Sequence, residues 1–84
     1  MNRHSHNFVD SYDGLVGFGY DRKCNENTLA CYLQKFSDDE HVKLILSRMS
    51  DEDMENLFEI LGKLLKKYLE EHEYHSVFLK DEEE

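Results

Sequence analysis

The clearest pattern of hydrophobic and polar positions begins at Ser50 and runs through the C-terminal half of the chain. Hydrophobic residues recur there at intervals of three and four, and Glu and Lys occupy the positions between them. This spacing predicts an amphipathic helix over about residues 51–71. Its hydrophobic arc covers roughly half of the circumference, wider than one packing partner requires, so we expect a central helix that contacts two elements or a second subunit. The arc comprises Met54, Leu57, Phe58, Ile60, Leu61, Leu64, Leu65, Tyr68 and Leu69.

Two shorter amphipathic segments precede this helix. In "NENTLACYLQKF" four hydrophobic residues follow the i, i+3, i+4, i+7 spacing, which predicts a helix over about residues 27–36. A second set of hydrophobic residues at helical spacing predicts another helix over about residues 38–49. Leu44 lies on the opposite side of that second helix, where it is a candidate for an exposed apolar contact. The two hydrophobic faces are formed by Leu29, Tyr32, Leu33 and Phe36 and by Val42, Ile45, Leu46 and Met49.

Capping residues mark where these helices are expected to start. Ser37 with Glu40, and Ser50 with Asp53, fit the capping box, in which a hydroxyl accepts from a free amide and a carboxylate reaches back. The first helix has three capping candidates, which are Asn25, Asn27 and Thr28.

Residues 7–20 show a different pattern. Asp13-Gly14, between "NFVDSY" and "LVGFGY", is a favoured pair for a two-residue type I′ turn, which predicts a β-hairpin. In that register one face would pack on the helices, and it would comprise Val9, Val16, Phe18 and Tyr20. We therefore expect a small α+β fold, mainly α, with the hairpin packed on three helices.

The C-terminal segment completes the predicted domain. Residues 73–79 fit either a short strand or a helix, and we expect a short helical turn. Residues 1–80 are predicted to form one small globular domain, since 84 residues rarely divide into two. Residues 81–84 are predicted to be a disordered acidic tail.

Three glycines, Gly14, Gly17 and Gly19, form a G-x-x-G-x-G cluster. Neither the dinucleotide fingerprint nor the phosphate-loop spacing is present. With a cap expected at Asn25, no helix N-terminus would follow the glycines directly. We interpret them as hairpin glycines, approached closely by an aromatic ring or another backbone.

The chain is acidic, with 19 Asp and Glu against 10 Lys and Arg and a net charge of −9. This charge argues against direct binding to nucleic acid or anionic lipid, which depends on cationic side chains. Ten of the acids lie at the predicted starts of the two later helices or in the tail, where helix dipoles and solvation account for them. An acidic mimic of nucleic acid remains an alternative interpretation.

No apolar stretch approaches the roughly 20 residues that span a bilayer, and the first residues do not resemble a signal peptide. We therefore expect a cytoplasmic protein with reduced thiols and no membrane contact. Catalytic motifs are lacking, so we expect no enzyme activity and no cofactor.

Cysteine and histidine supply the second alternative, a metal- or redox-responsive protein. The candidate thiol site is Cys24 with Cys31. Imidazoles and thiolates suit transition metals, but the spacings match no structural zinc module, so no metal site is assigned. The six residues considered are His4, His6, Cys24, Cys31, His72 and His75.

The function expected from these features is a small non-enzymatic protein-interaction or regulatory module. The wide hydrophobic arc of the long helix exceeds what a minimal core needs. A protein partner or self-association, such as a homodimer through the long helix, accounts for the excess. The candidate interface residues are Leu44, Leu57, Ile60 and Leu64.

Overall fold

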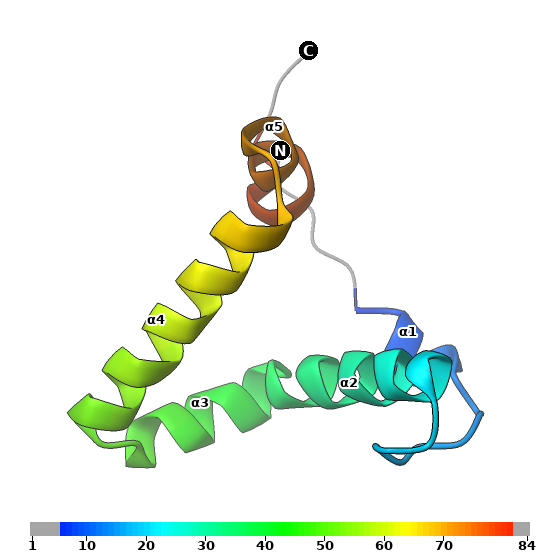
Figure 1. Ribbon diagram of the computed structural model, residues 1–84. Helices are drawn as coiled ribbons and strands as arrows, with labels where there is room; N and C mark the ends of the chain where they lie inside the picture. Colours follow the sequence, from blue (N-terminus) through cyan, green and yellow to red (C-terminus); the bar gives the residue numbers. More distant parts are fainter. Residues whose placement is uncertain (1–5, 82–84) are drawn as a thin grey trace. The chain divides into compact units, whose positions relative to one another are not determined.

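The computed structural model describes residues 6–81, and every regular element within them is a helix (Figure 1). In chain order the helices are α1 (Phe8–Ser11), α2 (Arg22–Phe36), α3 (Asp39–Arg48), α4 (Asp51–Tyr68), α5 (Glu71–Glu73) and the π-helix η1 (Tyr74–Leu79). The described residues fall into two compact units, residues 6–48 and residues 49–81. That residues 1–80 form one domain stays a prediction. Residues 82–84 of the predicted tail lie outside the described part of the chain.

The predicted N-terminal hairpin, and with it the α+β fold, is wrong. Residues 8–11 form α1, and no strand occurs between residues 6 and 81. A type I′ turn needs positive φ at both central residues, whereas Asp13 and Gly14 both keep negative φ. The glycine with positive φ is Gly19, at 108°.

The segment between α1 and α2 is a loop because side chains of α2 take the backbone groups that a hairpin would use. The Gly17 amide donates to Oγ1 of Thr28 at 2.8 Å, and the Gly19 amide donates to Oδ1 of Asn25 at 2.7 Å. The thiol of Cys24 donates to the Gly17 carbonyl at 3.2 Å. Such local side-chain bonds compete with strand pairing, and an isolated hairpin is only marginally stable.

Helix α2 begins at Arg22, earlier than the predicted residue 27, because Asp21 caps it. Asp21 has extended backbone angles, and its carboxylate accepts from the amide of Cys24 at 2.8 Å. An Asp in this position satisfies one of the free first-turn amides. The three residues predicted as caps lie inside the helix instead: Asn25, Asn27 and Thr28.

The interior of the first unit is small and lies against one face of α2. Among the described residues only Thr28 and Cys31 are buried, each with 4% of its surface exposed. Helix α1 packs on the same face, where the Val9 amide donates to Oε1 of Gln34 at 2.9 Å. Of the predicted hairpin face, Val9 is half-buried in α1. The other three members of that face are exposed: Val16, Phe18 and Tyr20.

The hydrophobic face predicted for the first helix is present on α2, but it is not covered. Its four residues are exposed: Leu29, Tyr32, Leu33 and Phe36. Polar side chains of α2, among them Thr28 and Gln34, hold the loop and α1. The four hydrophobic residues keep exposed surface, with Phe36 in edge-on contact with His41.

The junctions on either side of α3 differ in how well the sequence predicted them. Ser37 ends α2, its amide donating to the Leu33 carbonyl at 3.0 Å, and does not start α3. Asp38 fills the predicted role of Ser37, because its carboxylate accepts from the Glu40 amide at 3.2 Å. Before α4, Ser50 is the cap that the sequence predicts.

The second unit consists of α4, α5 and η1. Helix α4 ends at Tyr68, where Leu69 and Glu70 adopt extended angles and turn the chain into α5. Residues 73–79, for which the sequence left helix or strand open, are helical, and η1 ends at Lys80 with φ of 56°. No helix formed by residues 6–81 combines the length and the apolar character needed to cross a bilayer.

Candidate interaction surface

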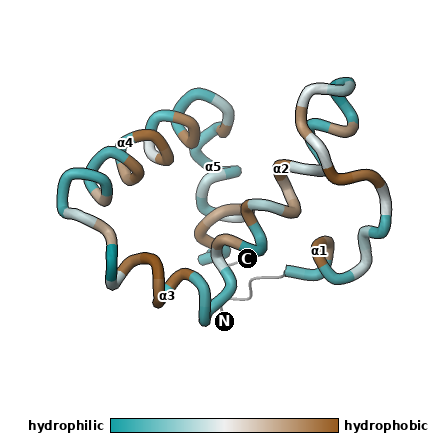
Figure 2. Tube along the Cα trace, turned by 90° about the horizontal axis from the view of Figure 1, so that it is seen from below, coloured by the Kyte–Doolittle hydropathy of each residue, from teal (hydrophilic) through white to brown (hydrophobic). Residues whose placement is uncertain are grey.

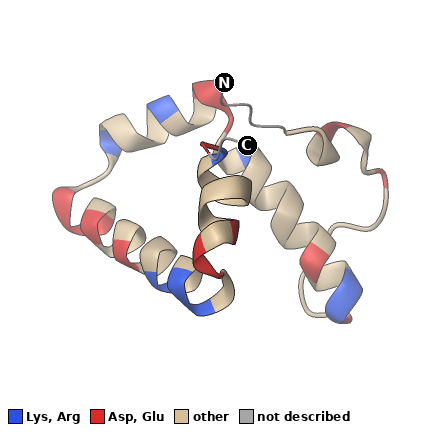
Figure 3. Ribbon diagram, turned by 90° about the horizontal axis from the view of Figure 1, so that it is seen from above, with Lys and Arg blue, Asp and Glu red and all other residues tan. Residues whose placement is uncertain are grey.

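Helix α4 is built with opposite charges at its two ends. The Ser50 hydroxyl accepts from the Asp53 amide at 3.1 Å, which fixes the start of the helix. Asp51, Glu52 and Asp53 occupy the first turn, and Lys66 and Lys67 occupy the last. Figure 3 shows this separation of red and blue along the helix. Both groups of charges complement the helix dipole, so they stabilise α4 without a contact to another element.

One side of α4 carries a row of large hydrophobic side chains, called here the apolar face. Figure 2 shows hydrophobic positions in brown alternating with hydrophilic positions in teal along α4. Phe58 and Tyr68 have 77% and 68% of their surface exposed, and Ile60 and Leu64 have 54% and 47%. Patches of this kind on a folded chain usually mark a contact with another surface. The apolar face comprises Met54, Leu57, Phe58, Ile60, Leu61, Leu64, Leu65 and Tyr68, and Leu69 follows directly after the helix.

The structure places three of the four predicted interface residues on this face. Ile60 and Leu64 are exposed, and Leu57 is half-buried. Leu44 lies on α3, in the other unit, and is 49% exposed. Its neighbours Val42 and Ile45 are half-buried, so Leu44 points away from their side of α3, as its position in the sequence indicates.

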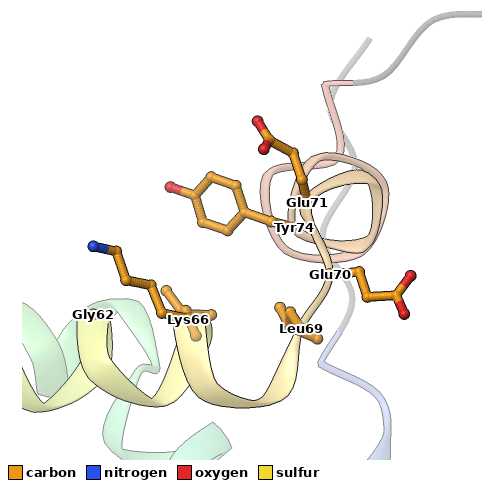
Figure 4. Close-up of a pocket in the computed structure, with 7 residues that line it drawn as sticks. Gly62, Lys66, Leu69, Glu70, Glu71 and Tyr74 are labelled. Carbon is orange, nitrogen blue, oxygen red and sulfur yellow. The ribbon is translucent and has the colours of Figure 1, made fainter.

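A groove that the sequence did not predict lies where α4 ends and α5 begins (Figure 4). Its volume is about 440 Å³. Leu65 and Leu69 supply its apolar surface, and the side chains of Lys66 and Tyr74 reach toward the same space. The remaining lining residues are Gly62, Glu70 and Glu71.

The groove exists because the chain turns sharply after Leu69. The Glu70 amide donates to Oε1 of Glu73 at 2.8 Å, which caps the start of α5. Tyr74 is held by stacking on Phe78, with ring centroids 5.5 Å apart. In the sequence, the three-residue spacing of Glu70 and Glu73 is the feature that could have indicated the start of α5. With apolar walls and charges of both signs at its rim, the groove suits a side chain from another polypeptide.

The two candidate thiols do not form a shared site. Cys24 and Cys31 lie on one face of α2, seven residues apart, which places them about 10.5 Å apart along the axis. A disulfide requires Cα atoms within about 7 Å, so this helix keeps the two thiols from bridging. Cys31 is a buried residue of α2, and Cys24 bonds to the Gly17 carbonyl and so helps to hold the loop on α2.

The histidines lie beside separate groups. His6 lies 3.2 Å from the Ser37 hydroxyl, and Nδ1 of His75 lies 3.2 Å from the Asp81 carboxylate. His72 is 3.8 Å from the carboxylate of Glu70. His4 lies outside the described residues. Within residues 6–81 no three His, Cys, Asp or Glu side chains are grouped to hold a metal ion.

The glycine cluster requires a second correction, because a helix N-terminus does follow it. Helix α2 starts three residues after Gly19 rather than near Asn25. The first-turn amide of Cys24 is nevertheless occupied by Asp21, and the amides of Gly17 and Gly19 donate to side chains of α2. The amides of Gly17, Gly19 and Cys24 are therefore already used within the chain.

One exposed ion pair stabilises the start of α2. Nε of Arg22 lies 2.8 Å from Oε2 of Glu26, one turn later. The hydrogen bond and positive charge of Arg22 lower the pKa of Glu26, with a smaller contribution from Lys23. Both side chains of this pair are exposed.

Comparison of the chain with protein-family models, curated proteins and solved structures found no match. The class of molecule is therefore defined by the geometry alone: a small helical chain that presents an exposed amphipathic helix with opposite charges at its ends. Its function is inferred from that surface.

Proposed function

We propose that this chain is a non-enzymatic protein-interaction module and that the apolar face of α4 is its docking surface. The observation that carries the proposal is the exposure of this face, with Phe58 at 77% and Ile60 at 54%. Burying apolar surface yields about 25 cal/mol per Å², so a partner that covers this face gains a large driving force.

The groove after α4 supports the same proposal. It lies beside Leu65 and Leu69, at the C-terminal end of the apolar face. A partner that docks on the face therefore has a recess into which one side chain fits. Binding surfaces commonly combine such an anchor pocket with an apolar surround.

Photo-crosslinking in cells that express the full chain tests the proposal. The photoreactive residue benzoylphenylalanine replaces Leu61 on the apolar face and, as a matched control, Glu59 on the opposite side of α4. The proposal predicts a discrete protein adduct from position 61 and little adduct from position 59. Equal labelling from both positions, or no protein adduct from position 61, would overturn it.

A further inference from the structure

We infer that the partner of α4 is α4 of a second copy, paired antiparallel. This inference rests on the proposed function and names its partner. Two features of α4 carry it: the spacing of a subset of its hydrophobic residues and the separation of its charges.

The hydrophobic subset follows the spacing of a two-helix seam. Five residues recur at alternating intervals of three and four, which are the a and d positions of a heptad repeat. They extend from the first turn of α4 to its last residue, so the seam runs the length of the helix. Four of them are exposed and one, Leu57, is half-buried. The seam comprises Met54, Leu57, Leu61, Leu64 and Tyr68.

The charges select the orientation of the pair. In a parallel pair the acidic first turns of both copies would lie together, as would the basic last turns. In an antiparallel pair each acidic first turn lies beside a basic last turn, and the two helix dipoles also oppose each other favourably. Only the antiparallel orientation therefore places the acidic turn of one copy beside the basic turn of the other, where the two attract.

The register follows from aligning the two helices end to end. Asp51 of one copy then lies opposite Tyr68 of the other, so facing residue numbers sum to about 119. Leu57 faces Leu61 of the second copy, and Asp53 faces Lys67 of the second copy. Asp53 and Lys67 lie two heptads apart, on the same flank of the seam, so their side chains are placed to pair between copies.

Zero-length carbodiimide crosslinking of the full chain tests this contact. Unlabelled and ¹⁵N-labelled chains are mixed, crosslinked and digested, and the joined peptides are identified by mass spectrometry. A link between Asp53 and Lys67 is diagnostic, because fourteen residues of one helix separate them by about 21 Å. The inference predicts that this link joins labelled to unlabelled chains.

Charge reversal gives an independent measurement that does not depend on crosslinking. D53K and K67D should each weaken dimerisation about tenfold or more, since each change disrupts two pairs in the dimer. The double variant D53K/K67D should recover most of the loss. E59K makes the same charge change as D53K on the opposite side of α4 and should leave dimerisation within about twofold. Circular dichroism confirms that each variant keeps its helices.

The outcomes separate this inference from the proposed function. Links confined to single chains, or single variants that dimerise as the parent does, overturn the antiparallel pair. If position 61 then photo-crosslinks to a different protein, the interaction module stands and its partner is not a second copy. If position 61 gives no adduct, both proposals fail.

Discussion

Gly17 and Thr28 exchange two hydrogen bonds through a single hydroxyl. The Gly17 amide donates to Oγ1 of Thr28 at 2.8 Å, and that hydroxyl donates to the Gly17 carbonyl at 3.2 Å. Thr28 is one of the two buried residues among those that the structure describes. The loop after α1 is thus fixed to α2 by a part-buried polar contact.

Replacing this hydroxyl should destabilise the first unit. Thr28→Val keeps the shape of the side chain but leaves the part-buried amide of Gly17 without this partner. We expect a loss of about 1–3 kcal/mol in the free energy of unfolding, measured by urea denaturation. Thr28→Ser keeps the hydroxyl and is the matched control. A Thr28→Val loss no larger than that of Thr28→Ser would show that the hydroxyl does not hold the loop.

Asp21 should control where α2 begins. Asp21→Ala removes the acceptor of the Cys24 amide and should lower the free energy of unfolding by about 1 kcal/mol. Asp21→Asn keeps an acceptor and should cost much less. Amide hydrogen exchange at Cys24 locates the effect, with faster exchange expected in Asp21→Ala. Unchanged exchange in that variant would place the start of α2 elsewhere.

Two glycines should respond in opposite directions to the same substitution. Gly19 has φ of 108°, which Ala adopts poorly, so Gly19→Ala should destabilise by about 1 kcal/mol or more. Gly62 lies inside α4 with open space around an added Cβ, so Gly62→Ala should stabilise by about 0.5–1 kcal/mol. Thermal unfolding followed by circular dichroism compares the two. Equal effects of both changes would contradict these backbone assignments.

Glu26 should titrate below the ordinary range of a glutamate. Arg22 lowers its pKa in the folded chain, so the stability of the pair is fully present above the unfolded pKa and is lost as pH falls through the folded pKa. An NMR pH titration of the Glu26 carboxylate should give this low midpoint, and Arg22→Gln should raise it. Lys23→Gln should raise it less, because Lys23 is the smaller cause. A midpoint insensitive to Arg22→Gln would contradict the ion pair.

The helices could be predicted where hydrophobic spacing and a cap point to the same residues. The helical spacing of hydrophobic residues in α4 and the capping residue Ser50 together predict where this helix starts. The structure has Ser50 as the cap. The predicted start of α2 is too late because Asn25 and Thr28 are residue types that favour capping positions. Both side chains bond instead to the amides of Gly19 and Gly17. The actual cap is Asp21, which directly follows the segment predicted to form the hairpin and is therefore not predicted to start a helix.

The hairpin and the groove could not be predicted for a different reason. Asp13-Gly14 favours a turn locally, but a turn becomes a hairpin only if its strands pair with each other. Here the residues that follow it bond to α2, through contacts that no local pattern encodes. The groove likewise depends on the angle at Leu69 and Glu70, which hydrophobic spacing does not specify.

The molar mass of the full chain in solution tests the central claim most directly. Sedimentation equilibrium of the parent chain, Leu61→Glu and the control Glu59→Gln measures this mass over a range of concentrations. We predict twice the 10.1 kDa mass of one chain for the parent and the control, and a single chain for Leu61→Glu. A single-chain mass for the parent at every concentration, unchanged by Leu61→Glu, would contradict pairing through the apolar face of α4.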